Sequence, residues 1–198
     1  MGKLITFLFR IFRVVKYKLL LDEFGISSVI NSPLRLDGCK NIRVGHKVIV
    51  QYKTWLAALP LTGEDSCFLE LQDGVTIGHF NHIFATKRIV IEKNVLTADK
   101  VYISDNLHQY TDIHLPVKEQ QINQCSEVII GEGSWLGENV CVIGAVVGKH
   151  CVVGANSVVT KDIPDYSVAV GAPARIIKKY CFTTNTWRKT DPQGNFID

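Results

Sequence analysis

The chain has 198 residues, 46% hydrophobic and 21% charged, so it is long and apolar enough to bury one sizeable core. This balance excludes a largely disordered chain. The formal net charge is only +3 and the basic residues are scattered outside the N-terminus, which argues against a nucleic-acid partner.

Residues 1–30 predict an amphipathic helical segment, because aliphatic residues recur at helical spacing. The shared face comprises Leu4, Leu8, Ile11, Val15 and Leu19. Five Lys and Arg residues are spread through the same stretch, so it suits neither a transmembrane helix nor a cleaved signal peptide. Two interpretations stay open. The helix packs on the rest of the protein or a neighbouring subunit, or residues 3–21 make peripheral contact with an anionic membrane.

Residues 31–174 carry a period of six, which predicts an all-β solenoid. Aliphatic residues follow one another in six-residue steps from Leu71 to Leu107, from Ile130 to Val142 and from Val147 to Val159. A three-sided coil has this period when each face points one aliphatic side chain inward and each corner takes a turn. The alternative is a β-sandwich in which the spacing is a coincidence.

Three places interrupt the period. The step from Val142 to Val147 is five residues, which predicts a shortened or bulged edge. Residues 109–126 break the pattern, and we expect a loop ejected from the coil. Residues 51–66 also break it, and their apolar character does not suit a fully exposed loop. Residues 175–198 predict a short helix and a tail that can close as a hairpin.

The stretch from Ile130 to Lys179 closely resembles the C-terminal half of hexapeptide-repeat acyltransferases, including galactoside and maltose acetyltransferases and surface-polysaccharide O-acetyltransferases. Its most specific segments are VVGANSVVTKDIP and GAPARII. Upstream, SDNLHQYTDIHLPVKEQ resembles the family's Asp-His-Asn-His-x-Tyr segment, from which Asn106 and Leu107 depart. The resemblance covers roughly residues 70–180. It implies a left-handed parallel β-helix, a homotrimer with active sites between subunits, and acetyl-CoA as co-substrate without a metal.

The resemblance also implies the catalytic residues. His108 matches the family's histidine and would act as general base on an acceptor hydroxyl, a task that suits a group titrating near neutral pH. Asp105 would orient the imidazole, or would form an Asx-type turn instead. A backbone N–H near Glu138 would stabilise the oxyanion, and no covalent enzyme intermediate is needed.

Coenzyme A and the acceptor take further residues by the same resemblance. The expected coenzyme-binding set is Trp135, Glu138, Ala155, Thr160, Lys161, Arg175 and Lys178, the last two near the phosphates. The ordinary alternatives are a packing aromatic for Trp135 and a solvated basic face for the cations. Candidate acceptor residues are Tyr110 and Asp112, for which plain loop roles are the alternative, and Asn81 and His82, which lie where the resemblance is weakest. The implied acceptor is a sugar hydroxyl of a surface polysaccharide or glycolipid precursor, with an antibiotic or an amino-sugar nitrogen as alternatives.

Two other classes remain as rivals. γ-Type carbonic anhydrases share the fold and bind zinc through histidines, for which His79 with His82, or His108 with His114, are conceivable pairs. A non-enzymatic scaffold is the other. The six cysteines form no CxxC pair and no zinc-site spacing, which indicates free thiols and a cytoplasmic protein, with peripheral attachment to the inner membrane face as an option.

Overall fold

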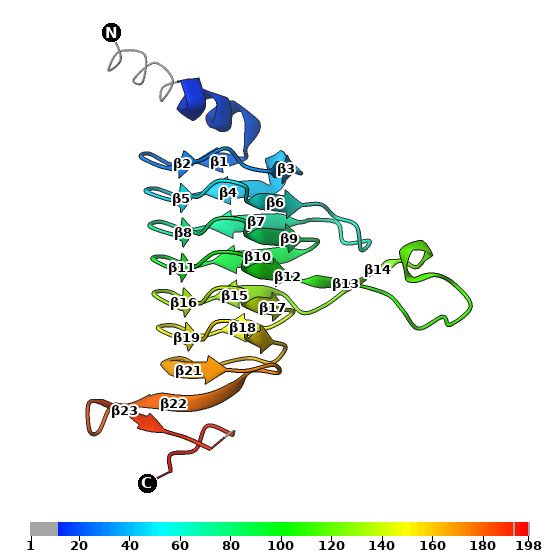
Figure 1. Ribbon diagram of the computed structural model, residues 1–198. Coiled ribbons are helices and arrows are strands. Elements are labelled where there is room, and N and C mark those ends of the chain that lie inside the picture. The colour runs from blue at the N-terminus through cyan, green and yellow to red at the C-terminus, as the bar shows by residue number, and fades with distance from the viewer. Residues whose placement is uncertain (1–11, 192, 198) are drawn as a thin grey trace.

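The computed structural model describes residues 12–191 and 193–197. The chain winds through three parallel β-sheets in turn, so that successive coils stack into a three-sided tower (Figure 1). Sheet A contains β1 (Glu23–Phe24), β4 (Ile42–Val44), β7 (Phe68–Leu71), β10 (Arg88–Ile91), β15 (Val128–Ile130) and β18 (Val146–Val147). The parallel-sheet architecture expected from the six-residue period is therefore present.

The other two faces repeat the arrangement. Sheet B contains β2 (Val29–Ile30), β5 (Ile49–Val50), β8 (Thr76–Ile77), β11 (Leu96–Thr97), β16 (Trp135–Leu136), β19 (Val152–Val153) and β21 (Ser167–Val170), followed by β22 (Arg175–Cys181) and β23 (Thr186–Lys189). Sheet C contains β3 (Arg35–Asp37), β6 (Trp55–Ala58), β9 (His82–Ala85), β12 (Tyr102–Ser104), β17 (Cys141–Ile143) and β20 (Val158–Val159). Each face thus advances by one strand per coil.

The core is the column of aliphatic side chains inside the tower. Every aliphatic residue of the six-residue series from Leu71 to Val101 is 1% exposed or less. The residues of the two series between Ile130 and Val159 are buried to the same extent. Leu107, the last member of the first run, is an exception: the prediction that it points inward is wrong. It is 42% exposed because the chain has already left sheet C at that point.

The corners carry backbone N–H groups that lie outside the sheet ladders and need other acceptors. Aspartates of the next coil accept some of them: Asp73 from His46, Asp99 from His79, Asp162 from Val146 and Asp165 from Lys149, all at 2.7–2.8 Å. Successive corners also approach closely. A Cβ on Gly131 would lie 2.5 Å from the carbonyl carbon of Gly148, so this corner requires glycine.

The irregular segments all lie at the corner between sheets C and A. The shortened step before Val147 turns at Gly144, whose φ is 54°. The earlier coil turns there through the 3-10 helix η1 (Cys39–Asn41). Residues 51–66 supply β6, where Leu56, Ala57 and Ala58 are fully buried, and then a loop of residues 59–67. Burial of β6 explains why this stretch is apolar.

The N-terminal segment caps the first coil. Residues 12–20 are helical, and the coil begins at Glu23, earlier than the expected boundary at residue 31. Tyr17 and Leu21 are buried in the main core cluster, so the described helix packs on the rest of the protein. The expected positions Leu4, Leu8 and Ile11 lie outside the described residues. No helix in the described part of the chain is long and apolar enough to cross a membrane.

The expected helix after residue 174 is wrong. Residues 175–181 form β22, which pairs antiparallel with β21 and then with β23, so that a hairpin closes the bottom of sheet B (Figure 1). An exposed edge of β21 would leave backbone groups unpaired, and the hairpin supplies their partners. The ring centroids of Tyr180 and Trp187, opposite each other across the hairpin, are 5.6 Å apart. All six cysteines are free.

Candidate active site

A two-stranded ribbon projects from the side of the tower (Figure 1), and His108 lies on one of its strands. Its strands are β13 (Asn106–His108) and β14 (Ile122–Gln124), which pair antiparallel with His108 opposite Ile122. The excursion therefore begins at Asn106 rather than at residue 109. Residues beyond the ribbon form an exposed loop that contains the 3-10 helix η2 (Val117–Glu119). The ribbon emerges at the corner between sheets C and A.

A buried carboxylate anchors this ribbon. Asp105 is fully buried, and its two oxygens accept the backbone N–H groups of Thr86, Lys87 and Arg88 at 2.7–2.8 Å and the Thr86 hydroxyl at 3.0 Å. No hydrogen bond among the described residues joins Asp105 to His108. The Asp105 carboxylate is engaged by the preceding coil, which argues against a role in orienting the imidazole, and the backbone N–H groups that it accepts belong to that coil rather than to an Asx-type turn of its own.

Gln124 links the ribbon to a second loop. Its amide donates to the Asp105 carbonyl at 2.7 Å, and its Oε1 accepts the hydroxyls of Thr86 at 2.8 Å and Thr62 at 2.6 Å. Asn106, which lies opposite Gln124 on the ribbon, donates to the Phe84 carbonyl of β9 in the tower at 3.1 Å. These residues were missed in the sequence, where a lone glutamine carries no signal of a contact 62 positions away.

A cavity of about 610 Å³ lies against one face of the ribbon, lined by Leu107, Asn123, Gln124, Cys125, Ser126, Ile143, Gly144 and Thr160. Leu107 and Asn123 are a cross-strand pair, so their side chains share a face of the ribbon. Side chains alternate along a strand, which directs the neighbouring His108 to the opposite face, the face that it shares with its cross-strand partner Ile122. The imidazole is exposed there and does not line this cavity.

The expected coenzyme-binding residues fall into two groups on either side of sheet C. Thr160 lines the cavity beside the ribbon, and Lys161 follows it at the same corner, exposed. The other group lies toward sheet B: Trp135 on its outer face, Glu138 and Ala155 at the corner between sheets B and C, and Arg175 and Lys178 on β22. A single protomer does not bring the two groups together.

At the corner around Glu138, most backbone N–H groups already donate hydrogen bonds to other coils. The N–H groups of its neighbours Gly137 and Asn139 already donate to the carbonyls of Val153 and Asp99. The N–H of Glu138 itself therefore remains the candidate oxyanion donor. The Glu138 carboxylate accepts the Lys100 ammonium at 2.7 Å, and this contact raises the pKa of Lys100.

Of the candidate acceptor residues, Asn81 is unsuitable. It is 1% exposed, its amide donates to the Ala98 carbonyl at 2.9 Å, and its oxygen accepts the Thr97 hydroxyl at 3.1 Å. The expectation that Asn81 binds substrate is therefore wrong, because its side chain already braces the corner between two coils. Tyr110 and Asp112 are exposed on the loop beyond the ribbon, where Asp112 accepts the backbone N–H of His114.

His82 belongs to an aromatic column on the outer face of sheet C. Its ring stacks on Trp55 with centroids 4.1 Å apart and meets Tyr102 edge-on at 5.3 Å. Desolvation by burial lowers the pKa of His82, and its buried Nε2 has no hydrogen-bond partner. The column was missed because its members come from three separate coils, which only the stacking register aligns.

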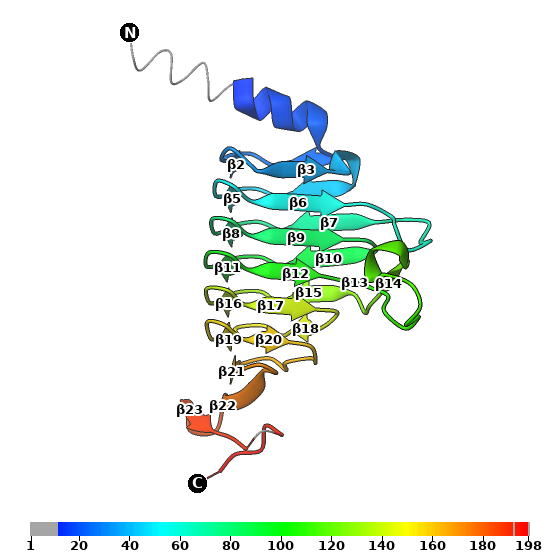
Figure 2. The ribbon, with the colours of Figure 1, turned by 45° about the vertical axis from the view of Figure 1, so that its right-hand side comes forward.

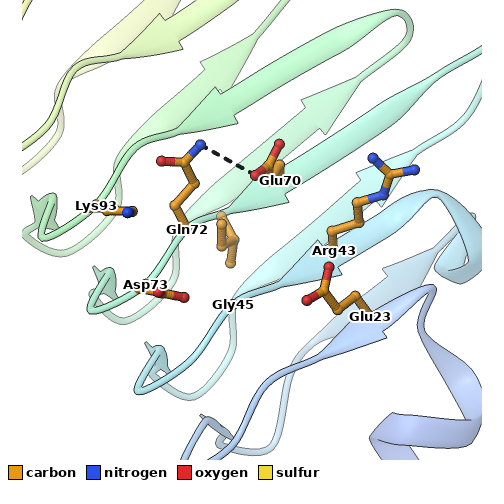
Figure 3. Close-up of a pocket in the computed structure, with 8 residues that line it drawn as sticks. Glu23, Arg43, Gly45, Glu70, Gln72, Asp73 and Lys93 are labelled. Carbon is orange, nitrogen blue, oxygen red and sulfur yellow. Dashed lines mark hydrogen bonds between the residues drawn. The ribbon is translucent and has the colours of Figure 1, made fainter.

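A second hollow, of about 200 Å³, lies on the outer side of sheet A (Figure 3). Its labelled side chains are Glu23, Arg43, Glu70, Gln72, Asp73 and Lys93. Charges of both signs are spread across four coils, and several of the side chains already make hydrogen bonds. Gln72 donates to Glu70 at 3.3 Å, and Asp73 accepts the His46 N–H. This hollow lacks convergent chemistry and is separate from the ribbon.

The described residues contain no group of three or more His, Cys, Asp or Glu side chains that could hold a metal ion. His79 pairs with Asp99 at 3.1 Å and packs on Tyr52, whereas His82 lies in the aromatic column. The two histidines of that conceivable zinc pair are therefore engaged with different neighbours.

Comparisons with known proteins agree with this architecture. Residues 127–161 match the family model "Hexapeptide repeat of succinyl-transferase". A protein of Escherichia coli K12, provisionally named a lipopolysaccharide biosynthesis O-acetyl transferase, is 40% identical over 124 residues, 59% of this chain and 63% of its own. A provisionally named acetyltransferase of Mycobacterium tuberculosis is 45% identical over 111 residues, 56% of this chain and 37% of its own. The chain therefore spans less than two thirds of either relative.

Solved structures extend the likeness to most of the tower. A maltose O-acetyltransferase from Clostridium difficile 630 is 30% identical, with a TM-score of 0.54 over 82% of this chain and 72% of its own. AntD, an N-acyltransferase from Bacillus cereus solved with dTDP and 3-hydroxybutyryl-CoA, is 16% identical and shares the fold, with a TM-score of 0.67 over 84% and 87% of the two chains. The chain belongs to the hexapeptide-repeat acyltransferase family.

Proposed function

We propose that this protein transfers an acetyl group from acetyl-CoA to a hydroxyl of a sugar in a surface polysaccharide or glycolipid precursor. The observation that carries the proposal is an exposed histidine, His108, on a ribbon whose base is fixed by hydrogen bonds of the buried Asp105 and of Gln124. A catalytic base must be accessible and held in position, and this arrangement meets both needs.

The chemistry needs no enzyme-bound intermediate. The acceptor hydroxyl attacks the thioester carbonyl carbon while the His108 imidazole takes its proton. The tetrahedral oxyanion then collapses, the C–S bond breaks, and the leaving thiolate receives the proton. A preorganised N–H, for which Glu138 is the candidate, stabilises the oxyanion. Because the acceptor hydroxyl must reach both the His108 imidazole and the thioester carbonyl carbon, the acceptor and the thioester would meet on the face of the ribbon that carries His108.

A trimer of left-handed coils completes the site in this proposal. The two groups of coenzyme residues lie on opposite edges of sheet C in one chain. Side-by-side packing of protomers would place the Thr160 edge of one against the Glu138 and Ala155 edge of its neighbour. Arg175 and Lys178, both exposed on β22, would then pair with the phosphates of coenzyme A at the lower end of the groove.

Oxygen is the favoured acceptor atom, since the maltose O-acetyltransferase and the E. coli relative are both named as O-acetyltransferases. An amino-sugar nitrogen is the second candidate. A dTDP-3-amino-3,6-dideoxy-galactopyranose 3-N-acetyltransferase of Aneurinibacillus thermoaerophilus is 45% identical over 67 residues. The product distinguishes O-acetylation from N-acetylation, because an ester is cleaved by mild alkali and an amide is not.

The test is an acceptor screen with acetyl-CoA in which thiol release is followed for the wild type, His108→Ala and His114→Ala. His114 lies on the same exposed loop and has no proposed role, so it controls for loop perturbation. We expect His108→Ala to lower kcat by roughly 10²–10⁴-fold, the usual contribution of a general base, and His114→Ala to retain activity.

Full activity in His108→Ala would overturn the site. Absence of acyl transfer to sugars, amino sugars and antibiotics alike would favour a scaffold. Zinc bound stoichiometrically to the purified protein would favour the carbonic-anhydrase class. Sedimentation equilibrium tests the trimer independently of activity.

A further inference from the structure

The helix of residues 12–20 has two apolar faces, and only one of them is used. Tyr17 and Leu21 are buried on the first coil, and Val14 and Leu20 pack beside them. On the opposite face, Phe12 is 66% exposed, Val15 49% and Leu19 73%. These three residues, spaced by three and four positions, form a continuous stripe that we call the outer face of the helix.

The helix is firmly attached, so the outer face is held in place. Arg13 donates to the Ile30 carbonyl and, at 2.8 Å, to the Asn31 side chain. At the other end, Lys40 donates to the Leu19 carbonyl at 2.9 Å, which satisfies a terminal carbonyl of the helix. A rigid apolar stripe exposed to water is unfavourable unless something covers it.

The charge of the segment indicates what that partner is. Residues 1–21 contain five Lys or Arg and neither Asp nor Glu. Arg13 is used for anchoring, but Lys16 and Lys18 are exposed on the helix beside the outer face. An apolar stripe bordered by lysines matches the interface of an anionic bilayer, which accepts apolar side chains below its headgroups and attracts cations.

We propose that the outer face of this helix binds the surface of an anionic membrane and lays the helix flat on it. The helix lies at the end of the tower opposite the C-terminal hairpin, clear of the ribbon in both views (Figures 1 and 2). Membrane contact there would leave the ribbon side free. Binding is independent of the proposed acyl transfer and can be measured without it.

The experiment is co-sedimentation of the full chain with vesicles of phosphatidylcholine alone or with about one third phosphatidylglycerol. The wild type should bind the anionic vesicles and lose affinity as salt rises, because screening weakens the cationic attraction. Val15→Glu with Leu19→Glu should weaken binding at least about tenfold, and Lys16→Gln with Lys18→Gln about fivefold for each lysine removed.

The matched control is Ile113→Glu, which places a charge at an apolar residue 87% exposed on the distant loop. It should leave vesicle binding unchanged. Circular dichroism of each variant verifies folding. The proposal is overturned if the wild type ignores anionic vesicles or if Val15→Glu with Leu19→Glu binds them normally. A drop in oligomeric mass in that variant without vesicles would identify a second copy of the chain as the partner instead.

Discussion

The coil and the β13–β14 ribbon are stabilised by different interactions. In the coil, one aliphatic side chain per face is buried every six residues, and parallel strands satisfy the backbone. The ribbon has almost no apolar burial of its own: Leu107 and Ile113 are exposed, and its base is held by hydrogen bonds of Asp105 and Gln124. Distributed burial tolerates local change, whereas a few buried polar contacts do not.

Asp105→Ala should give the largest effect. Three backbone N–H groups lose their acceptor, that of the fully buried Thr86 and those of the partly buried Lys87 and Arg88. Each unsatisfied buried donor costs about 1–3 kcal/mol, so we expect a loss of roughly 3–5 kcal/mol in the free energy of unfolding. Urea denaturation measures it, and amide exchange should show the ribbon opening first. The control is Asp162→Ala, which removes one bond to Val146 at an exposed corner. Equal losses of unfolding free energy in both variants would show that the ribbon does not depend more on a single carboxylate than the coil does.

The same substitution in both regions sharpens the comparison. Ile103→Val deletes one methylene from a fully buried side chain of the coil and should cost about 0.5–1.5 kcal/mol. Ile113→Val deletes it from the exposed loop and should change stability by less than about 0.5 kcal/mol. Thermal or urea unfolding of both variants is the measurement. A comparable cost at Ile113 would mean that the loop packs against something in solution.

The smallest effect concerns the aromatic column on sheet C. Burial lowers the pKa of His82 below its ordinary value of 6.5, so below that pH the unfolded chain binds a proton that the folded protein resists. The contribution of His82 is complete above pH 6.5 and is lost as pH falls through its lowered folded pKa. His82→Phe should therefore flatten the acid side of the stability–pH curve. An unchanged slope would show that His82 is not responsible for it.

The period of six was sufficient to predict the coil because the physical requirement repeats. Residues such as Ile83 and Val142 occupy equivalent inward positions in different coils, so each repeat of the spacing strengthens the prediction for the rest. The prediction failed where repetition ends. Leu107 fits the spacing but lies on the ribbon, and residues 175–181 form a strand because the free edge of β21 offers hydrogen bonds that local propensity does not reveal.

Candidate site residues were only partly predictable for a related reason. His108 stands out through its motif, and Thr160, which stays a predicted coenzyme residue, lines the cavity beside its ribbon. Asp105 belongs to the same motif and Asn81 was a candidate acceptor residue, but their polar atoms are occupied by neighbouring coils. A motif indicates which side chains occur together in the chain. It does not show which of their hydrogen bonds are already made.

The sequence by itself determined the three-sided parallel coil, most of its inward aliphatic residues and the existence of a segment that leaves it, since these follow from spacing along one chain. Only the tertiary structure decided that Asp105 and Gln124 hold the ribbon, that the helix of residues 12–20 keeps an exposed face, and that the residues expected to bind coenzyme A divide between two edges of sheet C. Those features depend on which coils become neighbours, and stacking brings together groups that lie 20 to 60 residues apart.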